Sequence, residues 1–199
     1  MLIALYSPAP QCGKSTIADH LVNEHGFTHL SFAEPLKAMA GTLLGFFGYS
    51  PQDAFHMTHV AKEAPLPEID SRITSRQLLR TLGTEWGRDC VHTDLWLRCW
   101  TSRYLSLCAK PGTPRVVVDD MRFLNEALLM QRFDAQLWKV ERPGVENSTT
   151  HRSEGDLDRL KLLSDPENDF SVGFDHLFIN DGSVDELLDA VDDTLAPFV

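Results

Sequence analysis

The chain has 199 residues, 43% of them hydrophobic and 24% charged, which is typical of one globular domain with a sizeable core. A net charge of −11 argues against a protein that coats nucleic acid, because a polyanion would be repelled overall. No apolar run approaches the roughly 20 residues of a membrane span, no signal-peptide pattern begins the chain, and the cysteines show no metal-binding spacing. We expect a cytoplasmic protein that binds neither membranes nor nucleic acid.

The first element is a short apolar run, residues 2–6, followed by a turn rich in proline and then by a helical pattern. In the turn, Gly13, Lys14 and Ser15 match the end of the motif G-x-x-x-x-G-K-[ST], whereas Pro8 replaces its first glycine. A strand that leads into a helix presents backbone N–H groups and the positive end of the helix dipole to phosphate oxygens. The pattern predicts a nucleotide-phosphate site, and an ordinary strand–turn–helix corner is the alternative.

The residues of this loop have distinct expected roles. Gly13 lets the backbone approach phosphates, Lys14 would reach the β- and γ-phosphates, and Ser15 would offer its hydroxyl to Mg²⁺. Pro8 is tolerable only where φ is near −65° and no N–H is needed. Six consecutive residues are therefore predicted to bind the nucleotide: Gln11, Cys12, Gly13, Lys14, Ser15 and Thr16.

The next segments indicate a parallel sheet with crossover helices. A helix is expected over 14–25, a strand over 27–32, and a second helix from Pro35 to Phe47. Lys37 would lie just past the carboxyl end of that strand, at the edge where ligands of open parallel sheets bind. It is a candidate for holding a second phosphate, and a solvated surface lysine is the alternative.

Residues 49–73 are predicted to form a loop-rich insertion. Asp53, His56 and His59 could be drawn as a metal site, but polar residues in a loop are the simpler interpretation.

A capping box at Thr74 and Gln77 predicts the start of another helix. Its expected buried stripe consists of Leu78, Leu79, Leu82 and Trp86. Arg76 and Arg80 would share the opposite face, with Arg72 just upstream. Arginine forks bind phosphate oxygens in pairs, so these side chains are candidate substrate ligands, with salt bridging as the alternative.

A helix over 94–107 is expected to bury Trp96 and Trp100, and the β-branched run 116–118 reads as a central parallel strand. Asp119, at the carboxyl end of that run, would hold Mg²⁺ or contact the substrate, and a structural helix cap is the alternative. Arg122 follows at the same sheet edge and is a candidate for both substrate binding and catalysis.

Five segments in this order resemble the bacteriophage deoxynucleoside monophosphate kinases, in the adenylate-kinase-like branch of the P-loop enzymes. They are GKST at 13–16, FAEPLK at 32–37, LRTLGTE at 79–85, DDMRFLNE at 119–126 and HRSE at 151–154. The resemblance implies a three-layer α/β fold with a parallel sheet flanked by helices. It also implies Mg²⁺-dependent transfer of the ATP γ-phosphate to a deoxynucleoside 5′-monophosphate, for DNA synthesis, in the host cytoplasm if the chain is phage-encoded.

The resemblance divides a single kinase domain into three parts: a core of residues 1–48, 110–141 and 174–199, an acceptor-binding region over 33–108, and a lid over about 142–172. The lid would exclude water and supply an arginine to the transferring phosphate. Arg142 is the candidate held by a strand end, and Arg152 is the mobile candidate. Asn180, after the last expected strand (176–179), would lie near the ATP base.

Three other functions remain open from the residues. A P-loop kinase of another small metabolite would share the loop and lid, and a non-catalytic nucleotide-binding protein could carry the altered loop. A GTPase switch is disfavoured because no N-K-x-D motif is present. The preferred base is left open, and so is the oligomeric state, with a homodimer as one option.

Overall fold

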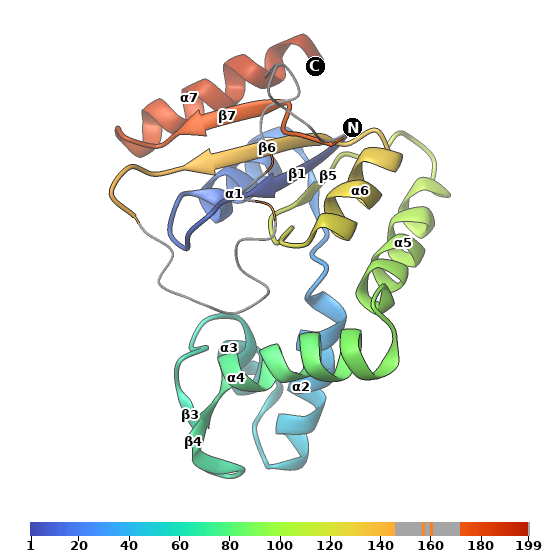
Figure 1. Ribbon diagram of the computed structural model, residues 1–199, viewed down its shortest axis with the longest axis vertical. Coiled ribbons are helices and arrows are strands. Elements are labelled where there is room, and N and C mark those ends of the chain that lie inside the picture. Colours follow the sequence, from blue (N-terminus) through green and yellow to red (C-terminus); the bar gives the residue numbers. More distant parts are fainter. Residues whose placement is uncertain (146–156, 158–159, 161–171, 199) are drawn as a thin grey trace. The chain divides into compact units, whose positions relative to one another are not determined.

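A computed structural model describes residues 1–145, 157, 160 and 172–198 of the chain (Figure 1). The chain divides into two units, which we call unit 1 (Met1–Ser31 and Tyr104–Val199) and unit 2 (Phe32–Arg103). Among the residues described, no helix is both long enough and apolar enough to cross a membrane.

Unit 1 is built on a five-stranded sheet whose strands all run parallel, in the order β2-β5-β1-β6-β7. The strands are β1 (Leu2–Tyr6), β2 (Thr28–His29), β5 (Val116–Val118), β6 (Gln136–Glu141) and β7 (His176–Ile179). β1 is central: Ile3 pairs with Val117 of β5 on one side and with Gln136 of β6 on the other. Every residue of β1 and β5 is buried, which explains why both read as unbroken apolar runs.

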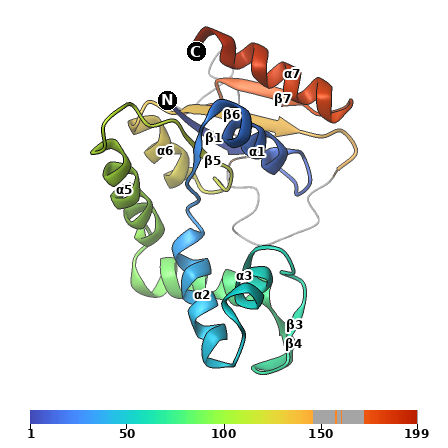
Figure 2. The same ribbon diagram turned by 180° about the vertical axis from the view of Figure 1, so that it is seen from behind.

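Helices cover both faces of this sheet, which confirms the predicted three-layer α/β fold. α1 (Lys14–His25) and α7 (Val184–Leu195) pack on one face, while α6 (Leu124–Arg132) covers the other (Figure 2). Strand residues and helix residues form one core beneath α1 and α7, among them Ile3, Leu5, Val117, Trp138, Ile17, Leu21, Leu187 and Val191. Side chains alternate along each strand, so buried residues of the other face, such as Ala4 and Val116, pack away from this core.

Unit 2 is mainly helical. It contains α2 (Glu34–Phe46), α3 (Pro51–His59), the hairpin β3 (Pro65–Leu66) and β4 (Asp70–Thr74), α4 (Ser75–Arg80), the π-helix η1 (Thr81–Val91) and α5 (Leu95–Cys108), whose last residues belong to unit 1. A small core forms around Leu44, Ala54 and Leu66. Trp96 and Trp100 are buried as predicted, and Trp100 packs on Phe32 with ring centroids 5.5 Å apart.

Three expectations about these elements were wrong. The strand predicted over 27–32 is only Thr28–His29, because the chain leaves the sheet after Leu30 donates a last bond to the carbonyl of Val117. Residues 49–73 are not mostly loop. Ser50 caps α3 by accepting the amide of Asp53 at 3.1 Å, and β3 and β4 then form a hairpin.

The third correction concerns Trp86, which was expected in a buried stripe but is 40% exposed. The helix begun at Thr74 widens into the π-helix η1 from Thr81 onward. A π-helix bonds i to i+5, so a stripe drawn at 3.6 residues per turn no longer follows one face. Gly87 is instead the residue that packs closely, because a Cβ there would lie 2.5 Å from the ring of Trp96.

Candidate active site

The loop between β1 and α1 has a backbone conformation that requires glycine at one position. Gly13 has φ of 110°, a left-handed value that side chains rarely adopt. A Cβ at this position would also lie 2.9 Å from Asn180 Nδ2 and 3.1 Å from Leu187 Cδ2. Two independent constraints, conformation and packing, therefore select glycine here.

Hydrogen bonds from side chains to backbone carbonyls stabilise the conformation of the loop. Ser7 Oγ donates to the carbonyl of Ala9 at 2.7 Å, and Asn180 Nδ2 donates to the carbonyl of Cys12 at 2.9 Å. Pro8 lies outside β1 and α1, so neither element needs the N–H that proline lacks. The two hydrogen bonds tie the loop to the end of β7 and to itself.

The first turn of α1 carries the side chains expected to meet phosphate. Gly13 offers no side-chain acceptor to the helix N-terminus, and the first helical bond runs from the amide of Ile17 to the carbonyl of Gly13, at 3.0 Å. Lys14 is half-buried, whereas Ser15 is exposed at the same end of the helix. This is the arrangement in which helix-end N–H groups, an ammonium and a hydroxyl are offered to one anion.

Two carboxylates follow β5, next to the strand that carries the loop. Asp119 Oδ1 lies 2.6 Å from His29 Nε2, and Asp120 Oδ2 accepts a hydrogen bond of 2.7 Å from Ser31 Oγ. Sequence reasoning selected Asp119 but missed His29 and Ser31. The signal lies in the topology, since β2 and β5 are parallel neighbours whose carboxyl ends meet at one edge.

A buried glutamate holds the backbone from which Arg122 emerges. Glu126 is 2% exposed, and its Oε2 accepts the amide of Arg122 at 2.7 Å and the amide of Phe123 at 3.0 Å. Sequence reasoning missed Glu126. Its signal was available, because a glutamate three residues after a helix N-cap position returns to the cap amide.

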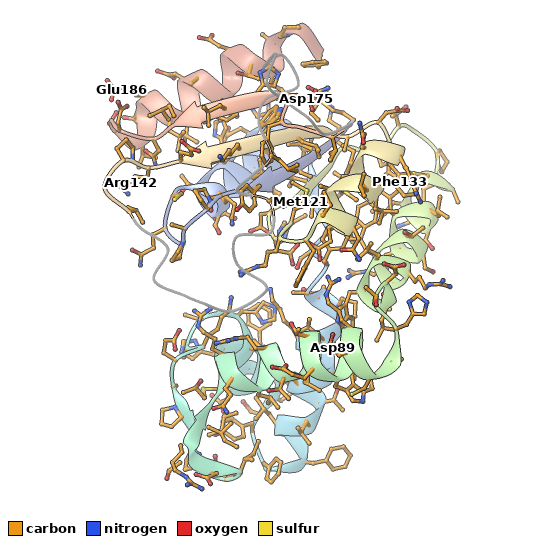
Figure 3. The ribbon with its side chains drawn as sticks, viewed as in Figure 1. Asp89, Met121, Phe133, Arg142, Asp175 and Glu186 are labelled. Carbon is orange, nitrogen blue, oxygen red and sulfur yellow. The ribbon has the colours of Figure 1, made fainter. Side chains whose placement is uncertain are left out.

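Of the two predicted lid arginines, the structure describes Arg142. Arg142 follows the last residue of β6 and is exposed (Figure 3). Arg152 lies outside the described residues. Asn180, predicted near the ATP base, directly follows β7 and bonds to the loop carbonyl of Cys12; a contact with the base stays a prediction.

In unit 2, Lys37 lines a cavity of about 410 Å³ formed by residues of α2 and α3. Phe55 and His59 also line this cavity, and their rings stack with centroids 3.9 Å apart. Burial lowers the pKa of His59, and the nearby Lys37 ammonium lowers that pKa further. The cavity therefore combines the ammonium of Lys37 and the carboxylate of Glu34 with an aromatic surface.

The three predicted arginines of unit 2 are exposed and differ in their partners. Arg72 forms a two-point contact with Asp70, in which Nη2 lies 2.6 Å from Oδ2, and its side chain is 87% exposed. Arg76 pairs with Glu63. No ion-pair partner of Arg80 occurs among the residues that the structure describes.

Arg88 is a cation of unit 2 that sequence reasoning did not select. It lies in η1, is only 6% exposed, and donates from Nη1 to the carbonyl of Thr93 at 3.2 Å. In the same π-helix, the carbonyl of Gly83 accepts a hydrogen bond of 2.7 Å from the indole N–H of Trp96. No sequence period signals these contacts, because they depend on the widened turn.

Comparison with known proteins identifies the family. The family model for deoxynucleotide monophosphate kinase matches residues 42–191, which is about three-quarters of the chain. The matched region begins after the phosphate loop. A protein of Acanthamoeba polyphaga mimivirus named "Putative deoxynucleotide monophosphate kinase" is 29% identical over 184 residues, covering 87% of this chain and 86% of that protein. With a phosphate loop on its central strand and this match over most of its length, the chain belongs to the deoxynucleotide monophosphate kinase family.

Proposed function

We propose that the chain transfers the γ-phosphate of ATP to a deoxynucleoside 5′-monophosphate and that the loop at residues 11–16 holds the donor. The observation that carries this proposal is the loop itself, with Gly13 in a left-handed conformation before Lys14 at the start of α1. Family membership supports the reaction, because phosphoryl transfer to a deoxynucleoside monophosphate is the activity for which the family is named.

Phosphoryl transfer needs positioning and neutralisation of charge rather than a covalent intermediate. Lys14 and the N–H groups of the first turn of α1 would bind the β- and γ-phosphates of ATP. The acceptor phosphate oxygen is the nucleophile, so no serine or cysteine has to attack. Arg142 or Arg152 is proposed to stabilise charge on the transferring group.

Mg²⁺ fits the donor atoms at this end of the sheet. The hydroxyl of Ser15 is exposed, and the carboxylate of Asp119 stands at the end of the neighbouring strand β5. Hydroxyl and carboxylate oxygens are the ligands that Mg²⁺ prefers. The bound ion would neutralise phosphate charge, and His29 would give up or share its contact with Asp119.

Each unit carries proposed acceptor ligands. In unit 1 they are Asp119 and Arg122, and Glu126 supports the backbone of Arg122. In unit 2 they are Lys37, Arg72, Arg76 and Arg80. Lys37 has the strongest structural support of these four, because it lines a cavity with stacked aromatic rings that could accommodate a base.

A coupled assay of ADP release tests this function. ATP and Mg²⁺ are supplied with each deoxynucleoside and ribonucleoside monophosphate in turn, with acceptor-free reactions as controls. We expect acceptor-dependent ADP release with one or more deoxynucleoside monophosphates. ATP binding without transfer to any acceptor would contradict the proposal, and turnover only with another class of phosphate acceptor would redirect it to a different P-loop kinase.

A further inference from the structure

Three side chains of unit 1 converge on one point, and the proposed kinase reaction uses none of them. His20 and His25 lie on α1, and Asp192 lies on α7. Asp192 Oδ1 is 2.7 Å from His20 Nε2 and 2.8 Å from His25 Nε2. These ligand-capable atoms all lie within 4.8 Å of one another, and the two imidazole rings meet edge to face at 5.2 Å.

The local fold holds these groups in place. Gly26, in a left-handed conformation with φ of 68°, ends α1 immediately after His25, and the amide of Phe27 returns to the carbonyl of Leu21 at 3.0 Å. Leu21 and Val191 adjoin His20 and Asp192 in the chain, and both are fully buried in the apolar core. The backbone on both sides of the cluster is therefore anchored by apolar packing.

The charge around the cluster favours a cation. Asp192 lies near the C-terminal end of α7, whose last turn contains no basic residue, and the exposed Asp189 and Asp193 belong to the same end. His25 is the last residue of α1, so the partial negative charge of that helix end also lies nearby. Arg115 is the neighbouring cation, and its Nη1 bonds to the backbone carbonyl of His25 at 3.2 Å rather than to the carboxylate.

We propose that His20, His25 and Asp192 form a site for a divalent transition-metal ion of the zinc type, which joins the end of α1 to α7. Two imidazole nitrogens and one carboxylate oxygen are a common ligand set for such ions, with water in the fourth position. In a tetrahedral site with bonds of about 2.0–2.1 Å, ligand atoms are about 3.3 Å apart. The observed separations of 2.7 and 2.8 Å therefore need to widen by about half an ångström.

Solvent can reach the site without unfolding. The side chain of Asp192 is 46% exposed, whereas those of His20 and His25 are 13% and 21% exposed. The carboxylate thus faces water while the two imidazoles lie behind it. A metal ion would replace the two hydrogen bonds to Asp192 with coordinate bonds and would stabilise the folded state by binding it selectively.

The test uses full-length, tag-free protein from which metal has been removed, and this protein is titrated with Co²⁺. The visible absorption of Co²⁺ changes when protein ligands coordinate the ion, so it measures binding. We expect one equivalent to bind with nitrogen and oxygen ligands and without the near-ultraviolet band of a cobalt–thiolate bond. Zn²⁺ should raise the midpoint of thermal unfolding by about 5 °C at saturation, whereas Mg²⁺ at the same concentration should not. Binding should weaken at acid pH, because protons compete for the ligands.

Two variants and two controls complete the experiment. His20→Gln retains a group that can hydrogen-bond to Asp192, so the fold should persist while Co²⁺ binds about tenfold more weakly or worse. Asp192→Asn should have a similar effect. His56→Ala, at an exposed histidine of α3, and Cys90→Ser with Cys108→Ser, at two exposed thiols, should leave binding unchanged.

Unchanged Co²⁺ spectra and thermal shifts in both His20→Gln and Asp192→Asn would overturn the proposal, as would a wild-type protein that binds no Co²⁺ at micromolar concentrations. Loss of binding in the cysteine variant would assign the ion to thiolates and would overturn it equally. The readout is metal binding, so the result does not depend on the kinase activity.

Discussion

The phosphate loop of unit 1 and the arginine-bearing segment of unit 2 were both predicted from sequence as anion sites, and their structures differ in how the binding groups are held. In the loop, buried or half-buried side chains bond to backbone carbonyls, as Ser7 does to Ala9 and Asn180 to Cys12. In the segment, exposed Arg72 and Arg76 bond to exposed or half-exposed carboxylates. Anion binding through the backbone is preorganised in the loop, whereas Arg72 and Arg76 must first exchange partners.

This difference has an energetic meaning. A surface ion pair contributes only about 0–1 kcal/mol, so a phosphate could displace the carboxylate of Asp70 or Glu63 at little penalty. The same weakness means that these pairs position Arg72 and Arg76 poorly. We therefore expect substitutions in the loop to have larger effects than substitutions of the paired arginines.

The largest effect is expected for Lys14→Ala. Removal of an ammonium that neutralises developing charge should lower kcat by about 10²–10³-fold or more. Urea unfolding should show little change in stability, since Lys14 is not part of the apolar core. Lys110→Ala, at an exposed position, is the matched control. Turnover close to that of wild type in Lys14→Ala would remove the loop from the mechanism.

Gly13→Ala tests whether packing or backbone conformation sets the loop geometry. We expect a loss of about 1–3 kcal/mol in the free energy of unfolding and a higher KM for ATP, because the new Cβ meets Asn180 and Leu187. Gly112→Ala is the control, since Gly112 has a similar φ of 96° but open space around it. Equal losses in the two variants would show that conformation alone is responsible.

Single arginine substitutions measured with both substrates compare the two regions directly. Arg122→Ala and Arg80→Ala should each raise the KM of the acceptor by about tenfold, with the KM of ATP nearly unchanged. Arg72→Ala should have a smaller effect, because Arg72 must first leave Asp70. If acceptor KM responds most strongly to Arg72→Ala, the paired arginine is the principal ligand and the ranking is wrong.

The smallest effect is expected from the pH dependence of His59. Burial and Lys37 lower its pKa in the folded state, so the unfolded state binds the extra proton more readily. Stability should therefore fall as pH drops through the ordinary histidine value of 6.5, and the loss should be complete below the lowered folded pKa. His59→Gln should reduce this loss relative to wild type, whereas His56→Gln should not. Urea midpoints measured from pH 8 to pH 5 provide the comparison, and identical slopes in wild type and His59→Gln would contradict it.

Local sequence signals predicted most of unit 1 correctly. The β-branched run before Asp119 and the motif of Gly13, Lys14 and Ser15 each act through neighbours in the chain. Unit 2 was predicted less well, because the turn of η1 widens where a side chain from another helix, Trp96, packs against Gly87 and bonds to Gly83.

The candidate site shows the same division. Sequence identified Gly13, Lys14, Ser15, Asp119 and Arg122, whose residue types and spacing are tied to one strand–turn–helix unit or one strand end. It missed His29 and Glu126, which hold Asp119 and the backbone of Arg122. It placed Asn180 near the ATP base but did not predict its bond to the loop carbonyl of Cys12. Asn180 lies 168 residues from its partner Cys12, and no periodicity reports a contact of that separation.

By itself, the sequence determined the parallel α/β class, the phosphate loop and the resemblance to a kinase family. These depend on short-range patterns: apolar runs bounded by turns, helix caps and a glycine–lysine motif beside a strand. Only the tertiary structure decided which cations are already paired, why Gly13 tolerates no side chain, and that His20, His25 and Asp192 meet across two helices. The physical reason is that pairing and packing depend on which distant segments of the chain lie against each other. The topology of the fold determines those contacts, and local residue patterns do not report them.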